Sequence, residues 1–270
     1  MRNTAILFSV LLFFSCITGA CSSQPDTAPK TNFANTSAAG ISFWNTMPSN
    51  GLIFIGSAGM RSNRDESIEA AILDIARKIA IFNRVEGQFV SHNKTGFGLF
   101  NNSPDTQTSL NFNEDYQDFT ENLEYDPDRD VIQIENTLFV RARFNSPGTI
   151  TIPYRLPPRS GGRPGWIDNP PKELPGYLVG IGFAGRRSSH RDAVNASFEA
   201  AIFSIIKAVS SQVSAELVIN HGNSLFDYAV IDENTISARG VLNGFYVLDT
   251  WIDTSTMSVW TLAIARIGEL

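Results

Sequence analysis

The chain has 270 residues, of which 43% are hydrophobic and 18% are charged, and its formal net charge at pH 7 is −6. This length and apolar content are enough to bury one or two modest cores. The acidic balance argues against nucleic-acid binding and against peripheral binding to anionic lipid, since both need clustered positive charge.

Residues 1–20 are predicted to be a lipoprotein signal peptide. A short basic start with Arg2 is followed by an apolar run over 5–17. That run is shorter than the roughly 20 residues that a membrane-spanning helix needs. We therefore expect residues 1–20 to be removed on export and to form no part of the fold.

Cys21 is expected to be the lipidated residue. The segment 17–21 reads Ile-Thr-Gly-Ala-Cys and resembles a bacterial lipobox, although Thr18 stands where leucine is preferred. Ordinary cleavage without lipid is the alternative. Cys16 is the only other cysteine, so the mature chain would have no disulfide. Ser22 after Cys21 favours sorting to the bacterial outer membrane, and residues 21–40, rich in Ser, Thr, Asn, Pro and Ala, are expected to be a flexible tether.

Two stretches, 51–79 and 176–209, carry the same parts in the same order. They read GLIFIGSAGMRSNRDESIEAAILDIARKI and GYLVGIGFAGRRSSHRDAVNASFEAAIFSIIKAV. Each has an apolar β-rich run, a glycine turn, a Ser-x-x-Asp step suited to a helix N-terminus, and a long helix with apolar residues at spacings of three and four. The shift between the copies is 126 residues at the turn and 130 at the shared EAAI, a difference of about one helical turn.

The predicted fold class is α+β, with two tandem strand-helix-strand-hairpin modules. Each module is expected to be an antiparallel sheet with one long helix on one face. The first covers 41–154 and the second 176–270, with the second module's Trp-Pro lead-in starting at 165. The Pro/Gly-rich segment 155–175 is expected to link them. Further strands are expected at 86–91, 131–144, 149–154, 244–253 and 257–267.

The first module contains an acidic insertion at 93–130. Nine acids lie in 105–130 against the single base Arg129, and a solvated loop is the preferred interpretation. Asp126, Asp128 and Asp130 resemble the first half of a calcium loop, but Val131 stands where its glycine belongs. An EF-hand is therefore disfavoured, while weak binding of a divalent cation stays open.

Trp44 and Trp166 each begin a Trp-x-x-x-Pro motif ahead of the first strand of a module. The preferred interpretation is that each tryptophan closes the open end of a small core. The alternative is that Trp44 and Trp166 bind a partner.

No catalytic residue, cofactor site or metal site is predicted. Gly180, Gly182 and Gly185 match the spacing of a dinucleotide fingerprint, but the first copy lacks its first glycine, so a tight turn with close helix packing is preferred. The three histidines, His92, His190 and His221, are scattered singly and are expected to be exposed or locally hydrogen-bonded.

The lipobox, the Trp-x-x-x-Pro motif, the strand ending in Gly-Ile-Gly-x-Ala and the Ala-rich helix together resemble the Lpp-twenty lipoprotein family, which includes a flagellar outer-membrane lipoprotein. The second copy carries nearly all of the pattern, whereas the first has Phe54-Ile55 where the family prefers Val-Gly. The resemblance implies a membrane-tethered α+β module without catalysis that associates laterally or with envelope partners.

The leading functional hypothesis is therefore a non-enzymatic outer-membrane lipoprotein, anchored through acylated Cys21. It would act as a scaffold or assembly module, as a homo-oligomer or with an envelope protein. The alternative is a binding module that captures a ligand or cation in the cleft between the modules or on the acidic insertion. An envelope hydrolase is the third and least favoured interpretation.

Overall fold

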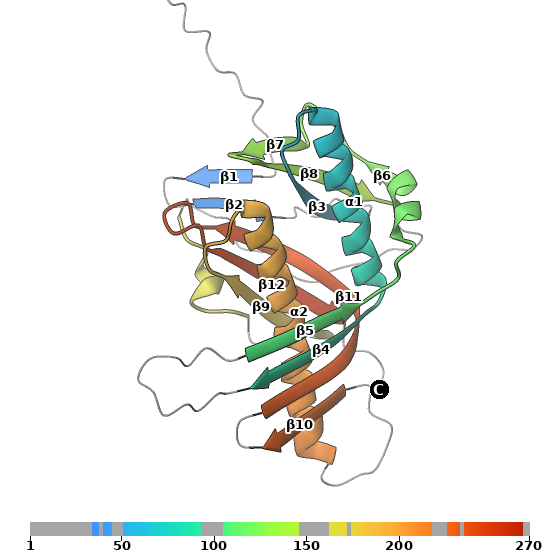
Figure 1. The fold of residues 1–270 in the computed structure, drawn as a ribbon, viewed down its shortest axis with the longest axis vertical. Helices are drawn as coiled ribbons and strands as arrows, with labels where there is room; N and C mark the ends of the chain where they lie inside the picture. The colour runs from blue at the N-terminus through green and yellow to red at the C-terminus, as the bar shows by residue number, and fades with distance from the viewer. Residues whose placement is uncertain are drawn as a thin grey trace, which may run out of the picture. The chain divides into compact units, whose positions relative to one another are not determined.

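The computed structural model describes residues 34–37, 40–44, 51–92, 105–145, 162–171, 174–217, 226–232 and 235–266. The expected signal peptide and Cys21 lie outside these residues. Residues Thr31–Leu270 form one compact unit. Its described part has two antiparallel sheets, two long α-helices and two short 3₁₀ helices, which confirms the α+β class (Figure 1).

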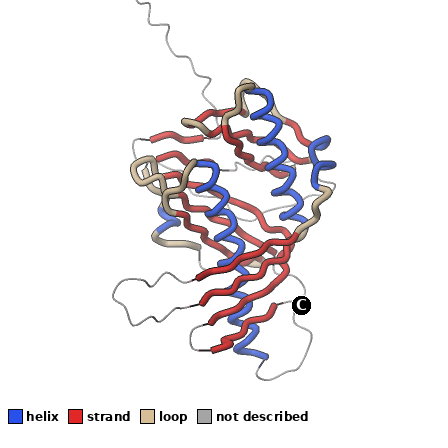
Figure 2. The backbone as a smooth tube through the Cα atoms, viewed as in Figure 1, coloured by secondary structure: helices blue, strands red, loops and turns tan. Residues whose placement is uncertain are grey.

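The elements follow one another along the chain in this order: β1 (Ala34–Ser37), β2 (Gly40–Trp44), β3 (Leu52–Gly59), α1 (Arg64–Asn83), β4 (Val85–His92), β5 (Asp105–Asn111), η1 (Tyr116–Asn122), β6 (Leu123–Glu124), β7 (Val131–Ile134), β8 (Thr137–Phe144), η2 (Gly165–Ile167), β9 (Tyr177–Ala184), α2 (His190–Leu217), β10 (Phe226–Asp232), β11 (Thr235–Ile252) and β12 (Val259–Arg266). The tube in Figure 2 shows how the two long helices lie among the strands.

The smaller sheet comes entirely from the predicted first module, residues 41–154, which is called the first half from here on, and the second half is residues 176–270. β3 pairs with β8 over its whole length, from Leu52 opposite Phe144 to Gly59 opposite Thr137. β6 and β7 pair with the other edge of β8. α1 packs on β3 and β8 through a buried stripe that includes Ala71, Ile75 and Ile79. The strand, helix and late strand of the predicted first module are therefore present.

The larger sheet has eight strands and is drawn from both halves. Its central element is β11, whose residues 235–242 lie between β10 and β4, and whose residues 243–252 lie next to β12 and β2. β9 pairs with β12 along its full length, as β3 does with β8. β2, β4 and β5 come from the predicted first module, so two separately folded modules are not confirmed.

The larger sheet bends around α2. In Figure 1, β9 and β12 pass behind this helix and β4 and β5 pass in front of it, and α2 contacts strands of both groups. Side chains on several sides of the helix are consequently buried, among them Phe198, Ile202, Phe203 and Ile206. The stretch His190–Ser210 is long and apolar enough to cross a membrane, yet 61% of its most apolar window is buried inside the fold, as a core helix requires.

Two glycines let the helices approach the sheets. A Cβ at Gly56 would overlap the Ala71 carbonyl oxygen of α1, and a Cβ at Gly182 would overlap the Ser197 carbonyl oxygen of α2. Both pairs are separated by the same 126 residues. The two closest helix–strand contacts are therefore 126 positions apart in the sequence. The two EAAI tetrads are 130 positions apart, so the second tetrad lies one helical turn further along its helix than the first. This geometry agrees with the prediction that Gly180 and Gly182 serve close packing of the helix and do not form a dinucleotide-binding turn.

The helix N-termini follow the prediction in one case and differ in the other. Ser189 Oγ accepts from the Asp192 amide at 3.1 Å, as expected for α2. In α1 the capping residue is Asn63, whose Oδ1 accepts from the Asp65 amide at 3.0 Å. The expectation that Ser62, the serine of the Ser-x-x-Asp step at 62–65, caps this helix is therefore wrong. Asn63 is the cap because it lies directly before Arg64, the first helical residue, and because asparagine caps a helix as well as serine does.

Two segments expected to be unstructured contain regular structure. Ala34–Ser37, at the end of the predicted tether, pairs with β2 as the edge strand β1. Residues 105–124, in the predicted solvated loop, form β5, η1 and β6, and η1 packs on α1. These polar segments are ordered because they add to existing sheet edges, which needs backbone N–H and C=O groups more than apolar side chains. The predicted strand over 149–154 lies outside the described residues.

The glycine contact predicts a large effect of a small substitution. Gly182→Ala should lower the free energy of unfolding by about 3 kcal/mol, because the added methyl group forces α2 away from β9. Gly185→Ala is the matched control, since its Cβ meets nothing within 4 Å, and it should be neutral or slightly stabilising. Urea denaturation of both variants measures the difference, and equal stabilities would contradict the packing.

Candidate functional site

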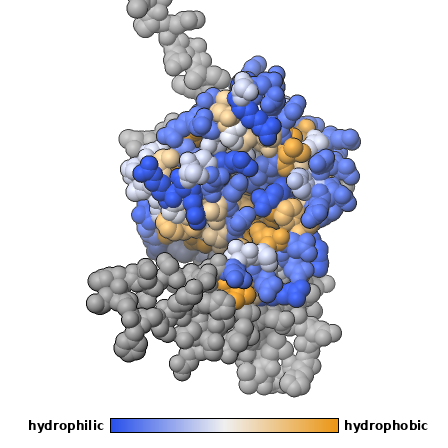
Figure 3. Space-filling view, in the orientation of Figure 1, coloured by the Kyte–Doolittle hydropathy of each residue, from blue (hydrophilic) through white to orange (hydrophobic). Residues whose placement is uncertain are grey.

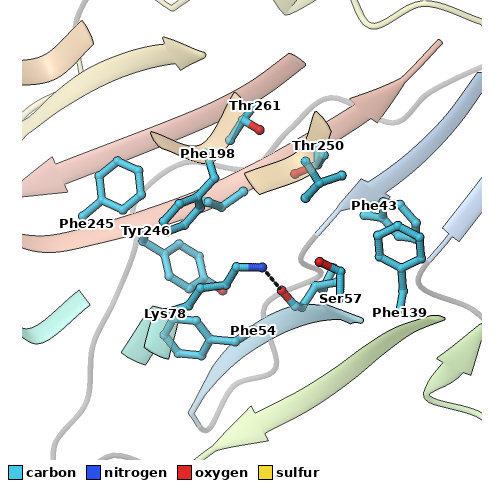
Figure 4. A pocket seen from close by; sticks show the side chains of 13 residues that line it. Phe43, Phe54, Ser57, Lys78, Phe139, Phe198, Phe245, Tyr246, Thr250 and Thr261 are labelled. Carbon is cyan, nitrogen blue, oxygen red and sulfur yellow. Dashed lines mark hydrogen bonds between the residues drawn. The ribbon is translucent and has the colours of Figure 1, made fainter. Parts of the chain in front are cut away.

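A small pocket lies where residues of the two halves meet. Its wall combines side chains from β2, β3, α1 and β8 with others from α2, β11 and β12 (Figure 4). The cavity has a volume of about 40 Å³. It is lined mainly by aromatic and aliphatic side chains: Phe43, Phe54, Ile55, Phe139, Val194, Phe198, Phe245, Tyr246 and Val247, with Ser57, Lys78, Thr250 and Thr261 as the polar members.

A buried ion pair forms the polar side of this pocket. Lys78 Nζ lies 2.8 Å from Asp74 Oδ2, one helical turn away on α1, and the two side chains are 8% and 11% exposed. Nζ also donates to the Ile55 carbonyl at 2.7 Å, the bond marked in Figure 4. Asp74 Oδ2 in turn accepts from the Ser57 amide at 2.8 Å. The pair therefore ties α1 to β3 beneath the pocket.

The ammonium of Lys78 donates to two acceptors among the described residues. A lysine has three donors, and among the described residues Asp74 and Ile55 take two of them. Nζ also lies 5.5 Å from the centre of the Phe198 ring, close enough for a cation–π contact. The Lys78 ammonium is thus a positive charge within a largely apolar wall.

The hydroxyl groups on the opposite wall are less available. Thr261 Oγ1 shares a 2.7 Å hydrogen bond with Ser197 Oγ, which also donates to the Val194 carbonyl at 2.9 Å. Tyr246 lines the pocket with its ring, while its hydroxyl donates to the Ile53 carbonyl at 2.7 Å. Lys78, Ser57 and Thr250 are the polar groups of the wall that remain.

Sequence reasoning did not single out Lys78, and the expectation that Asp74 faces solvent is wrong, because its side chain is 11% exposed. A signal was present, because Lys78 falls at the spacing of the buried stripe of α1, between Ile75 and Phe82, and four residues after an acid. A lysine inside an apolar stripe with an acid at i−4 is the pattern of a buried ion pair.

Trp166 is a core residue. It is 6% exposed, and its Nε1 donates to Asp249 Oδ2 at 2.6 Å in the interior of the larger sheet. This burial agrees with the core-closing interpretation. Trp44 is the last residue of β2, opposite Asp249, and its side chain lies outside the described part.

Two of the three acidic residues expected to resemble a calcium loop are paired with arginines. Asp126 Oδ2 lies 2.7 Å from Arg129 Nε, and Asp130 Oδ1 accepts from Arg141 Nε at 2.9 Å. The Asp128 amide, followed by the Arg129 side chain, lowers the pKa of Asp126 below its ordinary value. Among the residues that the structure describes, no group of three or more metal-ligating side chains comes together.

His190 differs from its expected exposed or hydrogen-bonded state. It is 3% exposed at the start of α2, with Nε2 3.2 Å from Glu135 Oε2 in the turn between β7 and β8. That distance suits an ion pair, but neither ring nitrogen has a well-aligned hydrogen bond among the described residues. His92 lies in β4 with its side chain outside the described part, and His221 lies outside it entirely.

A second notable surface is the edge formed by β9. β9 ends the strand path β1-β2-β11-β12-β9, and no described strand pairs with its outer edge. Phe183 on this strand is 54% exposed and packs against Trp260 with ring centres 4.8 Å apart and the ring planes tilted by 47°. Arg163 covers the same tryptophan at 5.3 Å from the ring centre. This group of Phe183, Trp260 and Arg163 is called the β9 patch below.

The face that carries α1 and α2 is mainly hydrophilic. Figure 3 shows smaller hydrophobic patches among its hydrophilic residues. Searches of protein-family models, of curated proteins and of solved structures find no match to the chain.

The ion pair gives a testable stability prediction. Lys78→Met keeps most of the side-chain volume but leaves Asp74 buried without its ammonium partner, so it should cost about 3 kcal/mol of unfolding free energy. Lys207→Met is the control, because Lys207 lies over the Phe89 ring and does not line the pocket. Its loss should stay below about 1 kcal/mol. Equal losses in guanidinium denaturation would contradict a special role for Lys78.

Proposed function

We propose that the chain is a lipid-anchored, non-enzymatic protein of the bacterial outer membrane that acts as a scaffold or assembly module. The support for the anchor is the lipobox-like segment ending in Cys21 and the apolar run before it. The support for assembly is the β9 patch on an edge strand. The resemblance to the Lpp-twenty family remains part of this proposal and rests on the sequence motifs alone.

The β9 edge is the observation that carries the assembly proposal. An edge strand offers a row of backbone donors and acceptors to which another strand can add. Beside that edge, Phe183 and Trp260 supply aromatic surface and Arg163 supplies a planar cation. Aromatic residues and arginine are the side chains most enriched at the energetic centres of protein interfaces. Homo-oligomers or an envelope protein partner are both compatible with such a surface.

A substitution in the β9 patch tests this contact. Phe183→Glu should weaken association at least tenfold, because it places a charge at the centre of the apolar contact. Leu73→Glu is the matched control, since Leu73 is also a large hydrophobic residue, 41% exposed, but lies on α1. Chemical crosslinking in intact cells, quantified for both variants, gives the comparison. Unchanged crosslinking of Phe183→Glu would remove the β9 patch from the proposal.

The anchor has its own test. Cys21→Ala should release the protein from the membrane fraction, and the mass spectrum of the parent protein should show a mature chain that begins at an acylated Cys21. A mature chain without acyl groups, still bound to the membrane, would contradict lipid anchoring.

A second candidate function is ligand binding, which the pocket between the halves favours. Lining residues come from both halves, and one buried cation faces a mainly apolar cavity. Binding sites commonly combine an apolar wall with a few placed polar groups. The acidic insertion is the weaker site for this function, because Asp126 and Asp130 already have arginine partners.

We also propose that the two halves are copies of one strand-helix unit. The support is that β3 with β8 and β9 with β12 share the same antiparallel pairing, and that Gly56 and Gly182 meet their helices at residues separated by the same shift. The copies would then have fused through β11 into one folded unit.

A further inference from the structure

A second pocket lies at the C-terminal end of α1, where this helix meets η1 and the strands β4 and β5 (Figure 1). Its volume is about 200 Å³, against about 40 Å³ for the pocket between the halves, and the two pockets share no lining residue. Polar side chains and two phenylalanines form most of its lining. This second pocket is called the α1-end pocket below.

The polar lining consists of planar side chains that each carry several hydrogen-bonding atoms. These side chains come from the end of α1, from β4, from β5 and from the residues just after β5: Asn83, Arg84, Glu86, Asn111 and Asn113. Asn111 lies directly opposite Glu86 in the β4–β5 pair, so both side chains are on the same face of the sheet. Each amide group offers one acceptor oxygen and two N–H donors, and the guanidinium offers five donors.

Several of these groups are available to a ligand. Among the described residues, the side chains of Asn83, Arg84 and Asn111 make no hydrogen bond or ion pair. Asn113 uses only its Oδ1, which accepts from the Asp115 amide at 3.1 Å, so its NH2 group keeps both donors. A ligand in the α1-end pocket therefore meets donors and acceptors from two sides, the end of α1 and the end of β5.

Phe112 and Phe119 form the apolar side of the α1-end pocket. Both are half-buried and are held by contacts outside the pocket. Phe112 packs against Tyr116 with ring centres 6.2 Å apart, and Phe119 packs edge-on against Phe144 at 6.0 Å. The face of an aromatic ring carries partial negative charge and attracts the positive edge of C–H bonds. The pocket thus suits a ligand that has C–H bonds on one face and polar groups around its edge.

The charges around the α1-end pocket favour a neutral ligand. The stretch just before Phe119 carries three exposed acids: Glu114, Asp115 and Asp118. These acids repel an anion, whereas the guanidinium of Arg84 in the lining repels a cation. The carboxylate of Glu86 already pairs with Arg239, whose Nε donates to it at 2.8 Å. An uncharged ligand avoids both repulsions.

The volume limits the ligand to one six-membered ring with substituents. A cavity of about 150 Å³ accepts one benzene ring, so about 200 Å³ leaves room for small groups around such a ring. Asn83, Arg84, Asn111 and Asn113 are exposed, so the remainder of a larger molecule extends into water. A sugar ring meets these conditions, because it is uncharged, carries C–H bonds on its face and has hydroxyls that both donate and accept.

We propose that the α1-end pocket binds one neutral sugar ring of a saccharide. Phe112 and Phe119 lie against the C–H face of the ring, and the side chains of Arg84 and Asn111 hydrogen-bond its hydroxyls. The inference goes beyond the proposed scaffold function, and it concerns a site separate from the pocket between the halves.

A set of small probes tests the ligand class on the purified full-length chain. The methyl glycosides of glucose, galactose, mannose and N-acetylglucosamine are neutral sugar rings. Cyclohexylmethanol has a ring of the same size with one hydroxyl, and the uronate of each glycoside adds a negative charge. Two-dimensional 1H–15N NMR titration gives the dissociation constants. At least one glycoside should bind tenfold or more tightly than cyclohexylmethanol, because the latter lacks most of the hydroxyls, and the matching uronate should bind more weakly than that glycoside.

Variants locate the sugar in the α1-end pocket. Arg84→Ala and Asn111→Ala should each weaken binding of the best glycoside about threefold or more, and neither should disturb the fold, because both residues are exposed. Gln88→Ala is the matched control, since Gln88 is also an exposed amide side chain on β4 but does not line the pocket. Its dissociation constant should stay within twofold of the parent value. In the parent chain, the side-chain NH2 signals of Asn83 and Asn113 should shift on binding.

Each failure has a separate meaning. Binding of none of the glycosides would overturn the inference. Equal binding of cyclohexylmethanol would overturn the sugar class, and tighter binding of the uronate would overturn the neutral class. Binding that Arg84→Ala and Asn111→Ala leave unchanged would place the sugar elsewhere and overturn the site. The scaffold function is decided independently, by the crosslinking of Phe183→Glu and the release of Cys21→Ala from the membrane.

Discussion

The pairing of β11 with strands from both halves is the constraint on which the fold depends. β11 has 18 residues, more than twice the length of β3 or β9, and it is hydrogen-bonded to β10, β4, β12 and β2. Since β2 and β4 belong to the first half, neither half can complete the larger sheet by itself. β1 pairs with β2, and β5 pairs with β4. These backbone hydrogen bonds order two segments whose own composition is polar.

The second consequence of β11 is the position of α2. A sheet that extends on both sides of β11 bends around this helix, so α2 is buried on several sides, whereas α1 keeps a hydrophilic outer face. Glycines on the strands permit the close approach: Gly182 on β9 lies against Ser197, and Gly87 on β4 lies against Ile206. The pocket between the halves lies where β3 and α1 of the first half meet α2 and β11 of the second half. The Lys78–Asp74 ion pair lies on the polar side of this pocket.

Local structure could be predicted from the sequence, and the way the halves combine could not. The apolar runs, the glycines and the long helical stretches after them indicated β3, α1, β9 and α2 because each of these signals lies within one continuous stretch of sequence. The first half of β11 was missed, since Thr235–Asn243 is short of large apolar residues and contains Gly240. Its stability comes from β4 and β10 on either side, and such long-range pairing leaves no local pattern. For the same reason, no local pattern marks Phe183 as an exposed residue, since its position on an edge strand depends on the order of strands in the sheet.

The central claim is that β11 makes the two halves one cooperative unit, which native-state hydrogen exchange tests most directly. In rising denaturant, amides of α1 and β8 in the first half and of β9 and β12 in the second should converge on one opening free energy and one denaturant dependence. Two separate opening free energies, with the first half and the second half exchanging independently, would contradict the account.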